Sequence, residues 1–207
     1  TTPPTSSAAS DVYKRQPLMS ETFSTYSIPQ IFIKGAPLIL IALGLSVGFK
    51  ANVWNIGAEG QYIMGAIFGA SFALSLYPLE SIVIFPAMIL IGVIGGCLWS
   101  MIPAFLKVKF QVNEILVSLM LVYVAEQILA LASLGFLRNP EGAGFPGSRN
   151  LNQYTSASNA EIIAGTGIHL GVLLSVLMVI FFYVLLFRHS LGFKIKLLGN
   201  SPKASGF

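Results

Sequence analysis

The stretch Asn52-Val53-Trp54-Asn55-Ile56-Gly57-Ala58-Glu59-Gly60-Gln61 gathers polar side chains between two apolar runs, at 28–49 and 62–77. An amide or carboxylate without hydrogen-bond partners in lipid costs several kcal/mol, so these groups must face protein, a cavity or the membrane interface. Two alternatives follow. The stretch is either a polar turn that joins two spans at the membrane surface, or a break in a helix that lines a transport pathway, as discontinuous helices do in transporters.

The composition of the whole chain identifies an integral membrane protein. Of 207 residues, 55% are hydrophobic and 10% are charged, whereas a soluble domain carries roughly 25% charged residues. Most basic residues flank the expected cytoplasmic ends of spans, which is the positive-inside bias rather than a sign of nucleic-acid binding. Neither the single Cys97 nor the two distant histidines, His169 and His189, form a metal-binding pattern, so no metal or other cofactor is expected.

Apolar runs of spanning length divide the rest of the chain. A bilayer-crossing helix needs about 20 mostly apolar residues. Candidate spans of this length lie at 28–49, 58–77, 82–106, 113–137 and 167–187. The second of them reaches spanning length only because it includes 58–61, the end of the polar stretch. The sequence therefore predicts an all-α, polytopic transmembrane bundle of about five spans, with a polar break around residues 52–61. Residues 1–16 are expected to be a disordered or non-native flank, 17–207 to be the membrane domain, and 153–164 to be able to form a short surface helix in a polar loop.

Small residues and one carboxylate mark positions inside the spans. Gly65 and Gly69, like Gly92 and Gly96, have the four-residue spacing that allows two helices to approach closely in lipid, so we expect helix packing there. Glu126 lies near the middle of the fourth span, where an ionisable group is expensive and usually functional. It either serves the solute pathway or forms a hydrogen bond between helices.

Basic residues also predict the orientation of the spans. Lys107 and Lys109 place the connection between the third and fourth spans inside, and Arg188 with the lysines of 190–207 places the tail inside. The N-terminal flank then starts outside. We therefore expect at least one helix upstream of this sequence, which makes the chain a fragment.

Enzymatic chemistry is not indicated. The sequence holds no Gly-x-x-x-x-Gly-Lys-Ser/Thr loop, so it is not expected to bind or hydrolyse ATP itself. It also holds no Ser/His/Asp or Cys/His constellation, and no paired carboxylates on one helical face. A pathway for a polar solute explains the amides and the carboxylate beside glycine-rich helices better than an enzyme does.

Several motifs resemble the inner-membrane permease subunits of bacterial ABC importers, of the nucleoside or simple-sugar type that works with basic-membrane-protein lipoproteins. The first is Asn55-Ile56-Gly57-Ala58-Glu59-Gly60-Gln61 followed by Gly65-Ala66. Further similarities are Val112-Asn113-Glu114-Ile115 with Ser118-Leu119-Met120-Leu121, Pro146 with Ser148, Gly192-Phe193, and Gly199 with Pro202 and Ala204. Departures from the family pattern occur at Val122, Ser201 and Ser205.

The resemblance implies a multi-pass permease subunit of the bacterial plasma membrane. Its expected partners are a cytoplasmic ATP-binding subunit that hydrolyses ATP, a second permease subunit, an extracytoplasmic substrate-binding lipoprotein and membrane lipid. Residues 190–207 would dock on the ATPase through Gly192, Phe193, Lys196, Gly199, Pro202 and Ala204, and the pathway would be shaped by Asn52, Asn55, Glu59, Gln61 and Glu126. Relatives continue for several more helices, so this chain is expected to be the central part of such a permease.

Two other classes of function remain open on sequence alone. An ion-coupled secondary transporter would take up solute without an ATPase. A membrane scaffold or enzyme would have no solute path, and the basic tail would then be a positive-inside flank without a partner.

Overall fold

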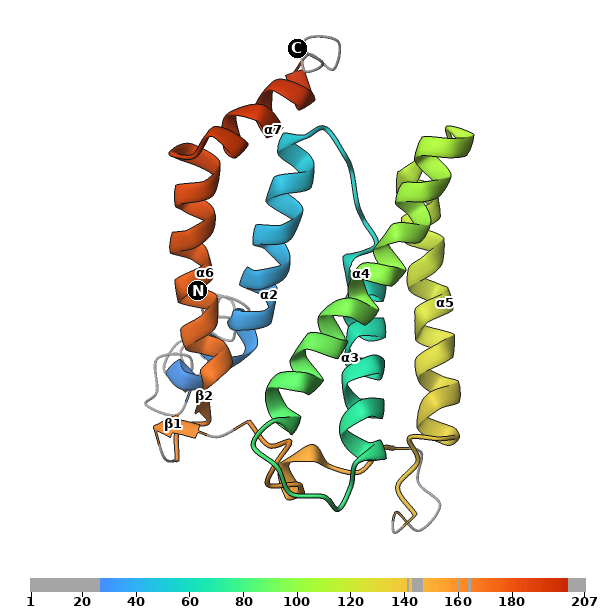
Figure 1. The fold of residues 1–207 in the computed structure, drawn as a ribbon, viewed down its shortest axis with the longest axis vertical. Coiled ribbons are helices and arrows are strands. Elements are labelled where there is room, and N and C mark those ends of the chain that lie inside the picture. Colours follow the sequence, from blue (N-terminus) through green and yellow to red (C-terminus); the bar gives the residue numbers. More distant parts are fainter. Residues whose placement is uncertain (1–26, 141, 143–146, 160, 164, 201–207) are drawn as a thin grey trace, which may run out of the picture. The chain divides into compact units, whose positions relative to one another are not determined.

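The structure is a computed structural model that describes residues 27–140, 142, 147–159, 161–163 and 165–200. The expected flank at 1–16 lies outside these residues, as do Pro202 and Ala204. In chain order the elements are α2 (Ser27–Lys50), α3 (Ala58–Ser75), α4 (Ile84–Phe110), α5 (Glu114–Leu134), η1 (Leu151–Gln153), β1 (Glu161–Ile163), β2 (Ile168–His169), α6 (Leu170–Phe187) and α7 (Ser190–Asn200) (Figure 1).

The expected all-helical, polytopic bundle is confirmed, because each predicted span is a helix. Within the described residues, α2, α4, α5 and α6 are long and apolar enough to cross a membrane. The remaining predicted span, α3, has 18 residues and begins with the polar end of the break, including Glu59 in its first turn. The chain is thus a multi-pass membrane protein in which one helix differs from the others in polarity.

The described chain falls into two compact units. Of the described elements, the first unit contains α2 as far as Ala42, β1, β2 and α6 as far as Phe182. The second unit contains Leu43–Asn159 and the chain from Tyr183 onward. In the first unit, β1 and β2 form an antiparallel pair that leads into α6. The second unit contains α3, α4, α5 and α7, and it holds the residues on which the functional argument rests.

Helices α3 and α4 pack antiparallel through the glycines that the sequence pattern singled out. A Cβ atom added at Gly65 would lie 3.0 Å from the carbonyl oxygen of Gly92, and one added at Gly96 would lie 3.1 Å from that of Gln61. Gly69 likewise faces Met88 and Gly92. Backbones this close leave no room for a larger side chain, so dispersion contacts between the two main chains hold the pair together.

The C-terminal end of α3 is closed by the loop that follows α5. Tyr154 and Ala157 from this loop are buried against Ala73 and Ile84. The Tyr154 hydroxyl donates a hydrogen bond to the carbonyl oxygen of Leu79, and its ring meets that of Tyr77 edge-on at 5.3 Å. The loop therefore packs against this end of α3 and is hydrogen-bonded to the turn that follows it.

The expectation of a short helix within 153–164 is wrong for the residues that the structure describes there. A 3-10 turn at Leu151–Gln153 and the β1–β2 hairpin occupy this part of the loop. The hairpin turn places Gly165 and Gly167 at φ of 79° and 73°. Because that conformation favours glycine, these two residues end regular structure and reverse the chain.

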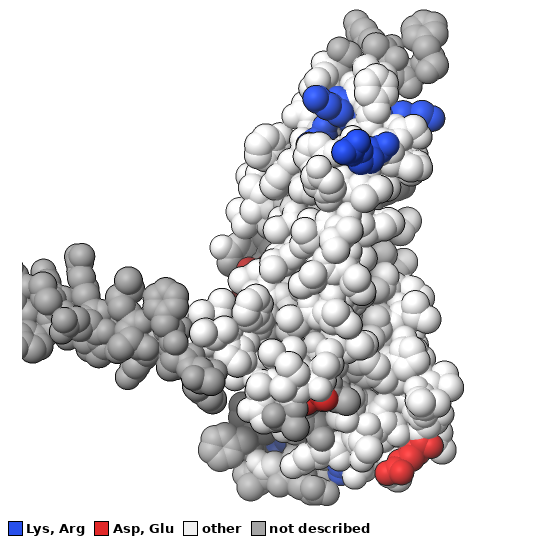
Figure 2. Space-filling model, turned by 90° about the vertical axis from the view of Figure 1, so that its left-hand side faces the viewer, with Lys and Arg blue, Asp and Glu red and all other residues white. Residues whose placement is uncertain are grey.

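The short helix α7 follows α6 after only Arg188 and His189. Lys and Arg side chains gather around α7, and no Asp or Glu lies among them on the face drawn in Figure 2. A Cβ atom at Gly192 would collide with the carbonyl oxygens of Leu185 and Leu186. Glycine at this position therefore permits the sharp change of direction from α6 to α7.

Candidate functional site

The polar stretch begins with a turn at the end of α2. The Val53 N–H donates to the carbonyl oxygen of Gly48 over 2.9 Å, and Asn52 adopts a left-handed conformation with φ of 57°. Asparagine tolerates this conformation better than most residues. The chain then runs without helical structure until α3 starts at Ala58.

Helix α3 starts partway along its neighbours rather than level with their ends. A Cβ at Gly57 would lie 2.7 Å from the carbonyl oxygen of Ser118, in the second turn of α5. The contact between Gln61 and Gly96 lies near the middle of α4, fourteen residues before its last residue, Phe110. At 1.5 Å per residue this separation is about 21 Å, and Figure 1 shows the segment before α3 running down beside the bundle.

The two alternatives for the polar stretch are thereby separated. A turn at the membrane surface would place the start of α3 beyond the ends of α4 and α5. Gly57, directly before α3, instead contacts Ser118 in the second turn of α5, and Gln61 in the first turn of α3 contacts the middle of α4. The geometry is that of a discontinuous helix, whose irregular backbone is tolerated at membrane depth only where it contacts protein or a cavity.

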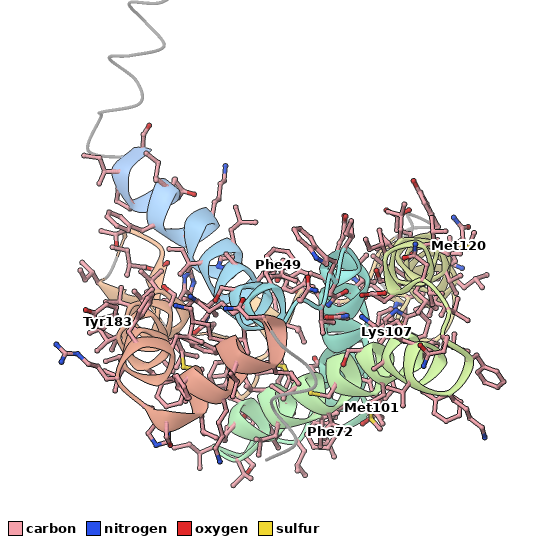
Figure 3. The ribbon with its side chains drawn as sticks, turned by 90° about the horizontal axis from the view of Figure 1, so that it is seen from above. Phe49, Phe72, Met101, Lys107, Met120 and Tyr183 are labelled. Atoms are coloured by element: carbon pink, nitrogen blue, oxygen red, sulfur yellow. The ribbon has the colours of Figure 1, made fainter. Side chains whose placement is uncertain are left out.

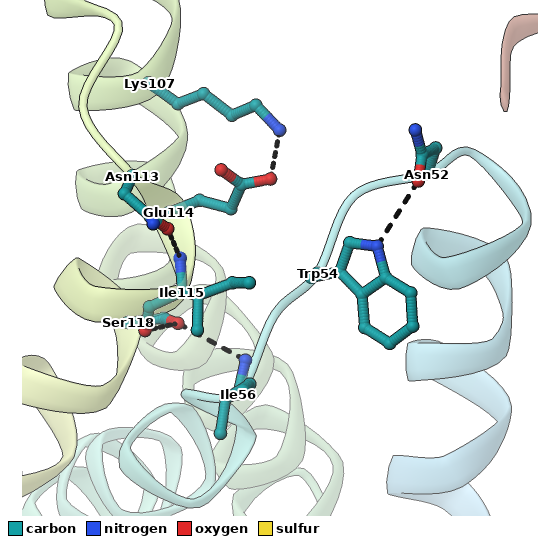
Figure 4. A network of polar contacts seen from close by, with 8 residues as sticks. All are labelled: Asn52, Trp54, Ile56, Lys107, Asn113, Glu114, Ile115 and Ser118. Carbon is teal, nitrogen blue, oxygen red and sulfur yellow. Dashed lines mark hydrogen bonds and ion pairs between the residues drawn. The ribbon is translucent and has the colours of Figure 1, made fainter.

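Short polar contacts fix this irregular segment. Asn55 Oδ1 accepts a hydrogen bond from the Gly57 N–H at 2.9 Å, and Asn55 Nδ2 donates to Gln61 Oε1 at 3.2 Å. The Ile56 N–H donates to Ser118 Oγ on α5 at 3.3 Å (Figure 4). Trp54 Nε1 donates to Asn52 Oδ1 at 3.3 Å. Backbone groups that no helix satisfies are thus paired with side chains.

A cavity of about 110 Å³ lies beside the start of α3. Its walls come from the irregular segment, α3, the last turns of α4 and the first turns of α5: Val53, Trp54, Asn55, Gln61, Ser100, Pro103, Ala104, Lys107, Glu114 and Ser118. Small-molecule sites usually enclose about 300–1,000 Å³. In this conformation the cavity is therefore of a size for water rather than for a sugar or nucleoside.

An ion pair belongs to the wall of the cavity. Lys107, from the last turn of α4, pairs with Glu114, at the start of α5. Figure 3 shows Lys107 among α3, α4 and α5, whereas Met120 lies on the outer side of α5. The pair spans the tight connection between the two helices, in which Asn113 Oδ1 caps α5 by accepting from the Ile115 N–H at 3.0 Å.

The residues predicted for the pathway separate into two groups. Asn55 and Gln61 are hydrogen-bonded to each other and line the cavity. Asn52, Glu59 and Glu126 are exposed on the chain and are not among the residues that line it. Neither glutamate has a hydrogen-bond or ion-pair partner within the described part of the chain.

Sequence reasoning missed three contributors to this site, namely Ser118, Lys107 and Glu114. Ser118 and Glu114 belong to the family-like motif at 112–121, but the motif does not indicate which groups they contact. The available signal was the seven-residue separation of Lys107 and Glu114 across the connection between two apolar runs. That spacing predicts proximity but not a shared cavity.

The predicted docking residues within the described part of the chain, Gly192, Phe193, Lys196 and Gly199, lie on α7. Phe193 and Lys196 are exposed, whereas Gly192 is buried at the junction with α6. Gly199 lies close to the carbonyl oxygen of Lys50, where an added Cβ would collide. No group of three or more His, Cys, Asp or Glu side chains suited to a metal ion occurs among the residues described.

The fold and the broken helix define a class of proteins, namely polytopic helical membrane proteins with a discontinuous span. Residues 27–207 match the family model described as "branched-chain amino acid transport system / permease component". The chain therefore belongs to this permease family.

Named relatives support this assignment. The chain is 31% identical over 193 residues to the glucose ABC transporter permease protein TsgB13 of Haloferax volcanii, covering 88% of this chain and 50% of that protein. It is 26% identical over 190 residues to the nucleoside ABC transporter permease protein NupB of Lactococcus lactis, covering 89% and 52%. It is 22% identical over 185 residues to the guanosine ABC transporter permease protein NupP of Bacillus subtilis, covering 88% and 52%.

The chain spans about half the length of these curated relatives. No solved structure matches it significantly.

Proposed function

We propose that this chain is part of the membrane-spanning permease subunit of an ATP-driven importer, and that it shapes the path of a small polar solute, a nucleoside or simple sugar. The observation that carries the proposal is the contact of the first turn of α3 with the middle of α4, with the amides of Asn55 and Gln61 beside a cavity. Transporters commonly place their solute sites at such helix breaks near the midplane.

The chemistry of the cavity suits a neutral, hydroxyl-bearing solute. A carboxamide offers both donors and an acceptor, and Ser118 adds a hydroxyl group. The named relatives are permeases for glucose, nucleosides and guanosine, which are all neutral molecules rich in hydroxyl groups. Because the present cavity holds only about 110 Å³, passage of such a solute requires α4 and α5 to move apart around the start of α3.

Exposed polar groups support the proposed partners. A carboxylate in the middle of a span, such as Glu126, is expensive unless protein or a water-filled path covers it. Further permease helices or a second permease subunit would cover Glu126 and Glu59. An extracytoplasmic lipoprotein would deliver the solute, and the assembly would sit in the bacterial plasma membrane.

The ATPase would be a separate cytoplasmic subunit that docks on α7. Helix α7 has 11 residues and presents the exposed ring of Phe193 beside lysines. An aromatic side chain at the centre of a small basic surface is a typical anchor in protein interfaces.

Uptake by proteoliposomes tests the solute path. With the permease, its ATPase and the binding protein reconstituted, we expect uptake of labelled guanosine or glucose to require ATP. Gln61→Leu keeps the side-chain size but removes the amide, so uptake should fall about tenfold, while Gln61→Asn should retain part of it. Uptake driven by an ion gradient without ATP would instead indicate a secondary transporter. If Glu59→Ala and Gln61→Leu impair only the assembly of the complex and leave uptake unchanged, the chain would instead be a scaffold.

Co-purification tests the docking of the ATPase separately. We expect Phe193→Ala to lower the amount of ATPase that co-purifies with the permease, because the substitution removes the exposed aromatic anchor. Phe136→Ala is the matched control, since Phe136 is similarly exposed after the far end of α5. ATPase retained at full stoichiometry by Phe193→Ala would contradict the docking role.

A further inference from the structure

A second and larger pocket lies where the end of α2, the end of α6 and α7 meet. It encloses about 400 Å³ and belongs entirely to the second of the two units. Its walls are Lys50, Leu186, Phe187, Arg188, His189, Ser190, Gly192, Phe193 and Lys196. The proposed solute path does not use this pocket, and none of its residues lines the cavity beside α3.

The pocket is strongly basic. Lys50, Arg188 and Lys196 contribute three cationic groups, and no carboxylate is among the lining residues. Lys50 Nζ lies 4.8 Å from the centroid of the Phe187 ring, a cation–π contact that holds the ammonium group at the pocket wall. Such a concentration of positive charge attracts anions.

The junction between α6 and α7 fixes the polar groups of the pocket. His189 Nδ1 accepts a hydrogen bond from the Leu191 N–H at 3.1 Å. In the neutral ring this bond leaves Nε2 as the N–H donor. The His189 N–H itself donates to the carbonyl oxygen of Val184 at 3.0 Å. These bonds hold the turn that presents Arg188 and His189 together.

The position of the pocket along the helices matches that of lipid headgroups. Lys50 is the last residue of α2, and Arg188 directly follows the last residue of α6. Both helices are apolar spans, with mean hydropathies of 2.0 and 2.9. Basic residues directly after such spans lie at the level of the phosphate groups of the bilayer.

We propose that this pocket binds the phosphate group of an anionic phospholipid. Arg188 can donate two parallel hydrogen bonds to phosphate oxygens, and Lys50 and Lys196 add point charges at the pocket wall. The exposed ring of Phe187 and the outer surface of α6 provide an apolar path for the acyl chains. Free phosphate would use the same cationic groups but would gain nothing from this apolar surface. Phe193 and Lys196 also belong to the proposed ATPase-docking surface, whereas Lys50 and Arg188 do not.

Native mass spectrometry of the detergent-purified permease tests the proposal. The probes are dioleoylphosphatidylglycerol, dioleoylphosphatidylcholine and inorganic phosphate. We expect the anionic lipid to bind more tightly than the zwitterionic one, and inorganic phosphate not to displace it at equal concentration. Arg188→Gln should weaken binding about fivefold, as expected for one charge near an anionic headgroup. Arg188→Lys should weaken it less, because the charge stays while the two parallel hydrogen bonds are lost.

The matched control is Lys109→Gln, which removes a lysine from the last turn of α4, outside the pocket. It should leave lipid affinity unchanged. If Arg188→Gln does not purify as a folded protein, Lys50→Gln provides the same test. Equal losses in Lys109→Gln and Arg188→Gln, equal binding of the two lipids, or displacement by inorganic phosphate would each overturn the proposal. Normal ATPase co-purification with Arg188→Gln would separate lipid binding from docking.

Discussion

The two ends of α3 lie in the same helical unit but are built in different ways. At its C-terminal end, Tyr154 and Ala157 are buried against Ala73 and Ile84, and the hydroxyl of Tyr154 reaches the carbonyl oxygen of Leu79. At its N-terminal end, side chains of an irregular segment satisfy the backbone beside a cavity of about 110 Å³. The closed end gains stability from packing, whereas the open end keeps polar groups where water or a solute can reach them.

The glycine contacts between α3 and α4 join the two ends, and breaking them should have the largest effect. Gly65→Leu would place a branched side chain where a Cβ already lies 3.0 Å from the carbonyl oxygen of Gly92. We expect a loss of about 3 kcal/mol in the free energy of unfolding, measured by SDS titration in mixed lipid–detergent micelles.

The control for this substitution is Gly44→Leu on α2, because a Cβ at Gly44 meets nothing within 4 Å. That change should leave the free energy of unfolding nearly unaltered. A similar loss in both variants would show that close backbone contact is not what holds α3 to α4.

A smaller effect is expected at the closed end. Tyr154→Phe removes the hydroxyl that donates to Leu79 and leaves a carbonyl oxygen without its partner in a packed region. The expected loss is about 1–2 kcal/mol, in the same titration. Tyr123→Phe removes a hydroxyl from an exposed position on α5 and should have little effect. A loss in Tyr123→Phe equal to that in Tyr154→Phe would contradict the assignment.

The smallest effect is expected at the open end. Ser118→Ala removes the acceptor of the Ile56 N–H, but water in the adjacent cavity can replace it. We expect a loss of about 0.5 kcal/mol relative to Ser133→Ala. Ser133 is a matched control because, like Ser118, its hydroxyl donates to the carbonyl oxygen three residues earlier on α5. A loss larger than that of Tyr154→Phe would mean that the two ends do not differ as described.

The helical spans on which this comparison rests could be predicted from the sequence. Runs of about 20 apolar residues predict spans because the bilayer core requires helices of that length, and each predicted span is helical. The depth at which α3 begins could not be predicted, because the same polar residues suit a surface turn and a helix break. Contacts of Gly57 with Ser118 and of Gln61 with Gly96 decide between them.

The candidate site was predictable only in part. Asn55 and Gln61 are close in sequence, so their hydrogen bond follows from local structure. Ser118 lies 62 residues from its partner Ile56, and apolar periodicity does not reveal which helix faces which. The role of Glu126 stays a prediction, since groups that would cover the exposed face of α5 are needed to test it.

The length of α4 has a consequence for the membrane itself. With 27 residues it rises about 40 Å, which exceeds the ~30 Å of a typical hydrocarbon core. It must therefore tilt, or extend its basic last turn into the headgroup layer, and the balance depends on bilayer thickness. Because α3 is fastened to α4 along its length, a thinner membrane would shift the depth of the polar break.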